Sequence, residues 1–255
     1  MRQIYPEPVG LDDRELAARY RPPGRPGEDS PWLRANMVAS LDGAATLGGR
    51  SGGLSGGADQ QVFALLRALA DVIMVGAGTA RVEGYRPVRP RTEGVRWAWL
   101  REGRPPSPPI AVVTRQLGLD LGSPLLASSP AHARTIVITT EAAPPGRREA
   151  AAATADVIVA GRESVDIRAA VAALAARGHR QILTEGGPYL LSQIIEAGLL
   201  DELCLTISPL LAGPGASRIV AGAGPAGQAA GDAGHALQLA HVLAEDGHLL
   251  CRYLR

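Results

Sequence analysis

Residues 184–191 read TEGGPYLL, and this stretch joins two apolar runs of different character. The run QILT at 181–184 leads in as a short strand, and after Pro188 leucine and isoleucine recur at helical spacing. Glycine permits a tight turn and proline suits the first helical position, so the stretch predicts a strand, a glycine turn and a helix N-terminus. Such a junction offers backbone N–H groups to a phosphate, although an ordinary tight connection has the same form.

The bulk composition excludes several classes of protein. The chain has 255 residues and a formal net charge of +1, so no global field draws it to nucleic acid or to an anionic membrane. All 26 basic residues are arginine, which excludes a Schiff-base lysine and a P-loop lysine. The N-terminus lacks an apolar signal segment and no run approaches transmembrane length, so we expect a cytoplasmic protein.

The cysteine and histidine pattern gives no sign of a metal site. Cys204 and Cys251 lie in apolar, strand-like runs and are expected to be buried thiols. None of the five histidines has a partner at metal-binding spacing, so we expect no metal.

Short apolar runs alternate with helical patterns along the chain. This order predicts an α/β fold with a mainly parallel, twisted sheet, helices on both faces and an antiparallel C-terminal edge. We expect residues 1–31 to form an extended arm, 32–255 a single domain and 86–109 an irregular insertion. The expected strands are 33–39, 72–76, 110–113, 135–139, 157–160, 181–184, 202–207, 237–243 and 248–254, with helices opening at Asp59 and covering 165–177 and the segment after 187.

Two further glycine motifs differ in their context. VGAGT at 75–79 directly follows an apolar strand, as a cofactor-binding turn should, but Arg81 replaces the third glycine of the dinucleotide fingerprint. GAGPAG at 222–227 matches that fingerprint but continues into a polar, glycine-rich segment. We therefore expect the first to approach a cofactor and the second to be a surface loop.

In order, the chain shows SLDG at 40–43, Ser51, LLRALADVIMVGAGT at 65–79, EGYRPVR at 83–89, AVVTR at 111–115, TEGGPYLL at 184–191 and LDELCLTISPLLAG at 200–213. This series resembles the riboflavin-biosynthesis pyrimidine reductase family over about residues 30–255, most closely its stand-alone actinobacterial members. The resemblance implies a dihydrofolate-reductase-like fold, a homodimer, and NADPH-dependent reduction of a phosphorylated ribosylamino-pyrimidine such as 5-amino-6-ribosylaminouracil 5′-phosphate. The deaminase motifs that accompany some members, H-x-E and P-C-x-x-C, do not occur here.

The resemblance also implies roles for individual residues. On the substrate side it implies Ser51, Arg67, Arg89 and Glu185. On the cofactor side it implies Val38, Ala39, Gly53, Gly76, Gly78, Thr79, Glu83, Thr114, Arg115, Gly186, Gly187, Pro188, Tyr189 and Leu190. The chain departs from the family at Gly53, where a tryptophan is frequent, and at Glu83–Gly84–Tyr85, where Asp-Asp-Pro is usual.

Several alternatives stay open at this point. Hydride transfer needs a proton as well, and Asp42, Glu185 or a water could supply it. Asp42 could instead shape its own turn, and Arg115 could meet the 2′-phosphate of NADPH or be a plain strand-end charge. A dihydrofolate or pteridine reductase and a non-catalytic NADPH-binding protein are the alternatives to a pyrimidine reductase.

Overall fold

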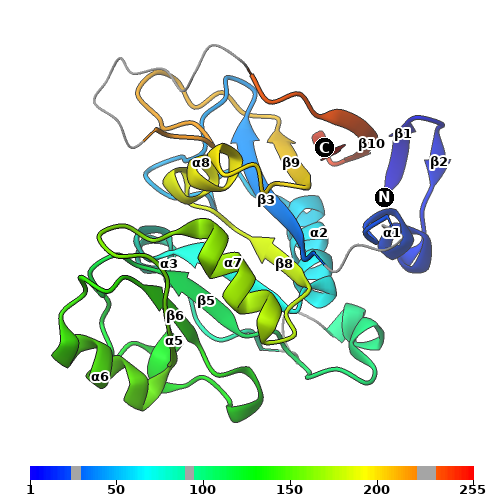
Figure 1. Ribbon diagram of the computed structural model, residues 1–255. Helices are drawn as coiled ribbons and strands as arrows, with labels where there is room; N and C mark the ends of the chain where they lie inside the picture. The colour runs from blue at the N-terminus through cyan, green and yellow to red at the C-terminus, as the bar shows by residue number, and fades with distance from the viewer. Residues whose placement is uncertain (24–29, 90–94, 223–233) are drawn as a thin grey trace. The chain divides into compact units, whose positions relative to one another are not determined.

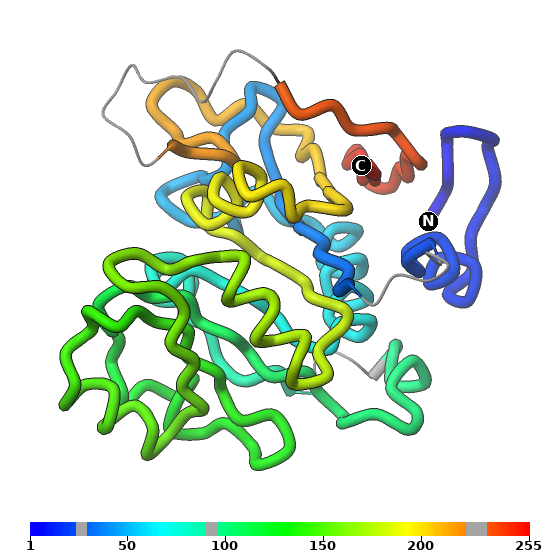
Figure 2. Tube along the Cα trace, in the orientation of Figure 1, coloured from blue at the N-terminus to red at the C-terminus, as the bar shows by residue number. Residues whose placement is uncertain are grey.

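The computed structural model describes residues 1–23, 30–89, 95–222 and 234–255 (Figures 1 and 2). They divide into two compact units. The first unit takes in Met1–Pro26, Leu33–Leu66 and Gly186–Arg255, and the second takes in Gly27–Trp32 and Arg67–Glu185. The expected division into an N-terminal arm and one domain stays a prediction. Most of the motif at 222–227 lies outside the described residues.

The second unit is built on a parallel sheet with the strand order β8-β4-β5-β6-β7. In β4, the side chains of Val72, Ile73, Met74 and Val75 are all fully buried, as the continuous apolar run predicts for a strand covered on both faces. The strands are β4 (Val72–Gly76), β5 (Ile110–Val113), β6 (Ile136–Thr139), β7 (Asp156–Val159) and β8 (Gln181–Thr184).

Helices and short 3₁₀ segments connect these strands. The predicted helix at 165–177 is α7, in which Val171 and Leu174 are buried. A helix at 145–154 was not predicted, because its alanine-rich sequence has little apolar periodicity. The elements are α3 (Ala77–Val82), η1 (Val95–Arg101), α5 (Pro124–Ala127), η2 (Ala131–Ala133), α6 (Pro145–Thr154) and α7 (Ile167–Ala176).

The first unit has the strand order β2-β1-β10-β11-β9-β3, with β3 and β9 parallel and the other pairs antiparallel. Its helix α2 opens at Gly57, two residues before the expected start, and Asp59 accepts a hydrogen bond from the Ser55 hydroxyl at 2.5 Å. The elements are β1 (Arg2–Tyr5), β2 (Val9–Gly10), α1 (Asp13–Arg19), β3 (Trp32–Ser40), α2 (Gly57–Leu69), α8 (Pro188–Glu196), β9 (Glu202–Ser208), β10 (Gln238–Glu245) and β11 (His248–Leu254).

The expected fold class is confirmed, including the antiparallel strands near the C-terminus. Within residues 1–23, the structure places β1, β2 and α1. β1 pairs with β10, and the N-terminal amine lies 3.0 Å from the Glu245 carboxylate on that strand, so the N-terminal segment is part of the sheet. Pairing with a strand more than two hundred residues away is not visible in the local sequence, which here is rich in proline and charge.

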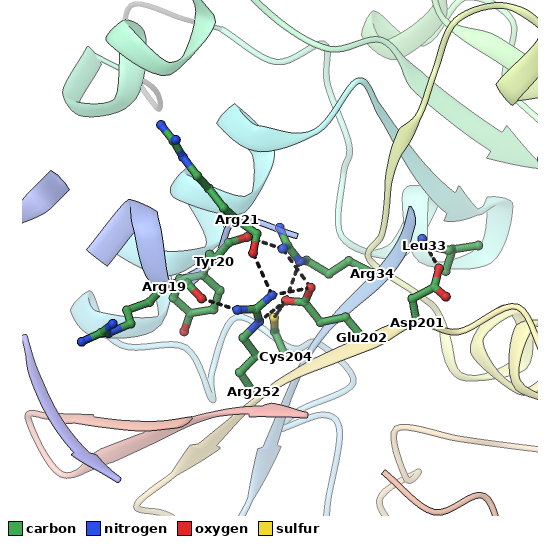
Figure 3. A network of polar contacts seen from close by, with 9 residues as sticks. All are labelled: Arg19, Tyr20, Arg21, Leu33, Arg34, Asp201, Glu202, Cys204 and Arg252. Atoms are coloured by element: carbon green, nitrogen blue, oxygen red, sulfur yellow. Dashed lines mark hydrogen bonds and ion pairs between the residues drawn. The ribbon is translucent and has the colours of Figure 1, made fainter. Parts of the chain in front are cut away.

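A buried carboxylate joins the N-terminal segment to this sheet (Figure 3). Glu202 on β9 has a fully buried side chain and lies between Arg34 on β3 and Arg252 on β11. Oε1 of Glu202 is 2.7 Å from Arg34 Nε and 2.8 Å from Arg252 Nε, while Oε2 accepts from the Nη2 atoms of both arginines at 2.9 and 3.1 Å. Burial raises the pKa of Glu202, but the two guanidinium groups outweigh it and bring the pKa below its ordinary value.

The same arginines hold the C-terminus of α1. Arg34 donates to the carbonyl of Tyr20, and Arg252 donates to the carbonyls of Arg19 and Arg21. These carbonyls have no intrahelical partner, so cations complement the negative end of the helix dipole. One carboxylate and two arginines thereby join β3, β9, β11 and α1.

We expect Glu202→Gln to lower the free energy of unfolding by about 3–5 kcal/mol at pH 7, because two buried guanidinium groups lose their counter-charge. Urea denaturation measures the change. Since the folded pKa of Glu202 is lowered, the difference between wild type and variant is present above the unfolded pKa, near 4.3, and shrinks as the pH falls through the folded pKa.

The matched control is Glu141→Gln. That carboxylate is exposed and lies 3.9 Å from Arg162, so its loss should change stability by less than about 0.5 kcal/mol. Equal stability of the Glu202→Gln variant and wild type at pH 7 would contradict the structural role of the network.

Candidate active site

The carboxyl ends of parallel strands gather several of the expected site residues at one edge of the second unit. In the register, Met74 of β4 pairs with Thr184 of β8, and Gly76 pairs with Val113 of β5. Glu185 follows β8 directly, the turn into α3 follows β4, and Thr114 and Arg115 follow β5. Ligands of open α/β sheets bind outside the carboxyl ends of the strands, so this edge is the candidate site.

Glu185 is the centre of a polar cluster at this edge. Its Oε1 accepts from Arg67 Nε at 2.7 Å, and its Oε2 accepts from Arg67 Nη2 at 2.9 Å and from the Tyr85 hydroxyl at 2.5 Å. The Glu185 side chain is only 3% exposed and that of Arg67 11% exposed. The structure therefore brings together two of the residues expected on the substrate side, in a bidentate ion pair.

Arg67 occupies the last turn of α2, whose C-terminal carbonyls are covered by two more arginines. Arg101, at the end of η1, donates to the carbonyl of Ala70 at 2.5 Å, and Arg104 donates to the same carbonyl at 3.0 Å. Arg104 also pairs with Asp71, whose other oxygen accepts backbone N–H groups at the start of β8. The insertion at 86–109 thus contributes cations that complement the helix C-terminus next to Arg67.

Tyr85 reaches Glu185 because of the way α3 ends. Gly84 has φ +69°, the N–H of Tyr85 bonds the carbonyl of Ala80 at 2.8 Å, and the N–H of Gly84 bonds that of Arg81 at 3.3 Å. These two bonds are those of a Schellman motif, which requires a left-handed residue that glycine supplies without strain. The departure from the usual Asp-Asp-Pro pattern therefore has a structural consequence, since it turns the chain and delivers a phenol to the carboxylate.

Among the expected cofactor residues of this unit, Gly76 is the N-cap of α3 and has φ −71°, so the VGAGT motif passes from strand into helix without a left-handed turn. Gly78 and Thr79 lie within that helix, Glu83 is its C-cap, and Thr114 is buried.

Arg115 lies in a loop that its neighbours hold in place. The carbonyl of Arg115 accepts hydrogen bonds from the hydroxyls of Thr139 and Thr140 at 3.2 and 3.0 Å, and Arg147 binds the carbonyls of Leu117 and Leu119. The Arg115 side chain is exposed. Its guanidinium makes no hydrogen bond or ion pair with the described residues.

In the first unit, the glycine turn ahead of α8 has the geometry that the sequence predicts. Gly186 has φ +81°, Gly187 is the N-cap with no side-chain hydrogen bond, and Pro188 opens the helix. Leu190 is buried, whereas Tyr189 is 60% exposed. A Cβ on Gly186 would lie 3.2 Å from Met37 Sδ, which shows how closely the backbone packs there.

Asp42, also in the first unit, fastens one loop to another. Its carboxylate accepts from the backbone N–H groups of Ala212 and Gly213 at 3.1 and 2.8 Å and from the Ser40 hydroxyl. The Ser40 hydrogen bond, followed by the two backbone bonds, lowers the pKa of Asp42 to about 2. The carboxyl is therefore ionised at neutral pH.

The remaining expected residues are placed as follows. Val38 and Ala39 lie on β3, the first half-buried and the second buried, and Ser51 is half-buried in the loop before α2. Gly53 in the same loop and Arg89 after Tyr85 are exposed. Sequence analysis missed Tyr85 as a site residue, and the signal that could have found it is the glycine that ends α3 just before it.

The described residues contain neither a membrane-spanning helix nor a cluster of metal ligands. No helix there is both long and apolar enough to cross a membrane. Nor do these residues group histidine, cysteine, aspartate and glutamate side chains in a way that could hold a metal ion.

Comparison with known proteins identifies relatives of this chain. It is 30% identical over 184 residues to the 2,5-diamino-6-ribosylamino-4(3H)-pyrimidinone 5′-phosphate reductase of Archaeoglobus fulgidus. The matched region covers 72% of this chain and 82% of the relative. The reductase of the same name from Methanothermobacter thermautotrophicus is 28% identical over 190 residues, spanning 72% of this chain and 80% of the relative.

A protein of known structure is also similar to this chain. A pyrimidine reductase-like protein of Corynebacterium diphtheriae superposes with a TM-score of 0.76 at 30% identity, covering 88% of this chain and 91% of the other. The sequence model of the RibD C-terminal domain family matches residues 31–249 of this chain. The chain therefore belongs to the RibD C-terminal domain family, as its ordered motifs indicate.

Proposed function

We propose that this protein is an NADPH-dependent reductase of a phosphorylated ribosylamino-pyrimidine and acts in riboflavin biosynthesis. The observation that carries the proposal is the 30% identity to a named reductase of such a substrate, over 82% of that enzyme's length. The names of these reductases favour the 2,5-diamino-4(3H)-pyrimidinone ring over the uracil ring that the family resemblance implies. The substrate would in either case be a small, anionic molecule.

The reaction defines what the chain must provide. When bound, NADPH supplies the hydride that C1′ of the ribose takes up as its bond to O4′ breaks, so O4′ must gain a proton. The protein's part is to bind the pyrimidine, to orient C1′ and to exclude water. Glu185, held in place by Arg67 and Tyr85, offers a fixed acceptor for an N–H or O–H group of the substrate.

The residues present fit a dinucleotide phosphate. The N-cap of α8 is a glycine with no side-chain hydrogen bond, so the first N–H groups of that helix are available for a pyrophosphate. Arg115 supplies an exposed guanidinium at the carboxyl end of β5, suited to a 2′-phosphate. The other residues proposed to line the cofactor are Val38, Ala39, Gly53, Gly76, Gly78, Thr79, Glu83, Thr114, Gly186, Pro188, Tyr189 and Leu190.

On the substrate side we propose Ser51, Arg67, Arg89 and Glu185. Two donor atoms of Arg67 bind Glu185, and Arg89 is exposed, so we propose Arg89 for the 5′-phosphate and Arg67 for holding Glu185. A homodimer and a cytoplasmic location stay predictions, and light scattering tests the first.

The function is tested by following NADPH oxidation with the diaminopyrimidinone phosphate, the corresponding uracil phosphate, both dephosphorylated compounds, dihydrofolate and a dihydropterin. We expect the phosphorylated pyrimidines to react and their dephosphorylated forms to react poorly. Exclusive turnover of a folate or pterin would identify the enzyme as a pteridine reductase, and NADPH binding without any turnover would identify a binding protein.

We expect Arg115→Gln to weaken NADPH binding while leaving NADH binding unchanged. Loss of a charge-assisted phosphate contact should cost about 1.5–3 kcal/mol, which is roughly 10- to 150-fold in Kd. Titration calorimetry with both cofactors measures the effect. Arg177→Gln, at the exposed C-cap of α7, is the matched control and should bind both as wild type does. Equal affinity of the wild type for NADPH and NADH would contradict the assignment.

We propose that Asp42 anchors the loop at 212–213 and that the proton comes from elsewhere, because an ionised carboxylate has none to give. Asp42→Asn should keep kcat within about tenfold of wild type, whereas removal of a general acid typically costs about 10²- to 10⁴-fold. A loss in that larger range with the fold intact would restore Asp42 as the proton donor.

The same variant has a predicted pH signature. The folded pKa of Asp42, about 2, lies below its unfolded value of about 3.9, so its contribution to stability is present above the unfolded pKa. That contribution is lost as the pH falls from about 4 towards 2, and the loss should be absent in Asp42→Asn. Thermal unfolding across this pH range measures it.

A further inference from the structure

Tyr85 is the one member of the Glu185 cluster to which the family resemblance gives no role. We propose that Tyr85 is a positioning residue of the active site: with Arg67 it fixes the Glu185 carboxylate so that a single lone pair, on Oε1, is left to accept a hydrogen bond from the substrate. The inference rests on the proposed function, since it concerns the substrate that Glu185 would contact.

The count of donors supports this assignment. An ionised carboxylate has about four lone-pair directions. The described residues use three of those of Glu185, namely one on Oε1 through Arg67 Nε and two on Oε2 through Arg67 Nη2 and the Tyr85 hydroxyl. Oε2 is saturated and Oε1 is not, so the cluster presents one acceptor in one direction. A ligand that binds there must therefore offer an N–H or O–H group.

The phenol suits this task better than a second cation would. The Arg67 guanidinium already balances the charge of Glu185, and a neutral donor adds a hydrogen bond without adding charge. Burial and then the Glu185 charge raise the pKa of Tyr85 well above its ordinary value, so the hydroxyl stays protonated and can only donate to the carboxylate at neutral pH. The Tyr85 ring also lies 5.7 Å from Arg67 Cζ, within the range of a cation–π contact that holds the guanidinium in place.

The backbone around Tyr85 is built to hold this position. The left-handed Gly84 and the hydrogen bond from Tyr85 N–H to the Ala80 carbonyl end α3 and fix the exit direction of the chain. The N–H of Glu185 in turn bonds the carbonyl of Met74 at 3.0 Å, so both partners are anchored to β4 or to the helix that follows it. Both ends of the phenol–carboxylate hydrogen bond are thus fixed by backbone contacts.

The test is Tyr85→Phe, which removes only the hydroxyl. We expect a fall of about 10- to 100-fold in kcat/KM for the phosphorylated pyrimidine, mostly through KM, as for a lost hydrogen bond to a charged group. NADPH affinity and thermal stability in the presence of NADPH should stay close to wild type. Tyr5→Phe, an exposed tyrosine on β1, is the matched control and should leave kcat/KM unchanged.

A double-mutant cycle decides whether Tyr85 acts through Glu185. In a Glu185→Gln background, Tyr85→Phe should change the Kd of the pyrimidine phosphate, titrated calorimetrically with NADP⁺ present, by no more than about twofold. If Tyr85→Phe weakens binding equally with and without Glu185, or changes neither binding nor KM in the wild-type background, Tyr85 does not position the carboxylate and the inference is wrong.

The two proposals fail in different ways. A wild type that reduces the pyrimidine phosphate, together with a Tyr85→Phe variant that matches it, overturns this inference and leaves the proposed function standing. A wild type that binds the pyrimidine phosphate without reducing it overturns the proposed function. The role of Tyr85 is still supported if binding weakens in Tyr85→Phe while the double variant binds no more weakly than Glu185→Gln alone.

Discussion

The ion pair between Arg67 and Glu185 is the contact on which the candidate site depends. It joins positions 118 residues apart in the chain, the last turn of α2 and the residue directly after β8. Both side chains are largely buried, so removing either partner takes away the opposite charge that a buried ion depends on, which is strongly destabilising. The pair therefore fixes the last turn of α2 to the residue that follows β8. Arg101 and Arg104 extend this constraint, because they fix the C-terminal carbonyls of the helix that carries Arg67.

Among the described residues, the buried glutamates Glu185 and Glu202 differ in the number of hydrogen-bond donors around them. Glu202 receives contacts from two guanidinium groups and from the Cys204 thiol, and its side chain has no exposure. All its lone pairs are used, so it can only hold strands together. Glu185 has one arginine and one phenol, and an acceptor direction on Oε1 remains. Because this direction lies at the carboxyl edge of a parallel sheet, where ligands of such sheets bind, we propose it as the contact for the substrate.

Sequence patterns predicted the strands from β3 to β11 and the helices α7 and α8, because continuous apolar runs and helical periodicity report burial directly. They did not predict β1, whose pairing with β10 is a long-range contact, or α6, whose alanines carry little periodicity. For the candidate site as well, the sequence predicts individual residues but not the contacts that the fold makes between them. Family motifs pointed to Arg67 and Glu185 separately, but their bidentate contact arises from the fold. Asp42 was expected as either a turn residue or an acid, and only its two backbone donors, 170 and 171 residues away, distinguish these roles.

Gly84 and Tyr85 show how a local departure from a family pattern can be read physically. The usual Asp-Asp-Pro would place a proline where this chain has Tyr85, and proline can neither donate through a side chain nor supply the N–H that bonds the Ala80 carbonyl. Replacing it therefore changes two things together, the exit of α3 and the third donor on Glu185. In a site that recognises its ligand through one remaining acceptor, the direction of that acceptor sets which donor of the substrate is read. On our proposal, Gly84 and Tyr85 therefore set the direction in which Glu185 meets the substrate.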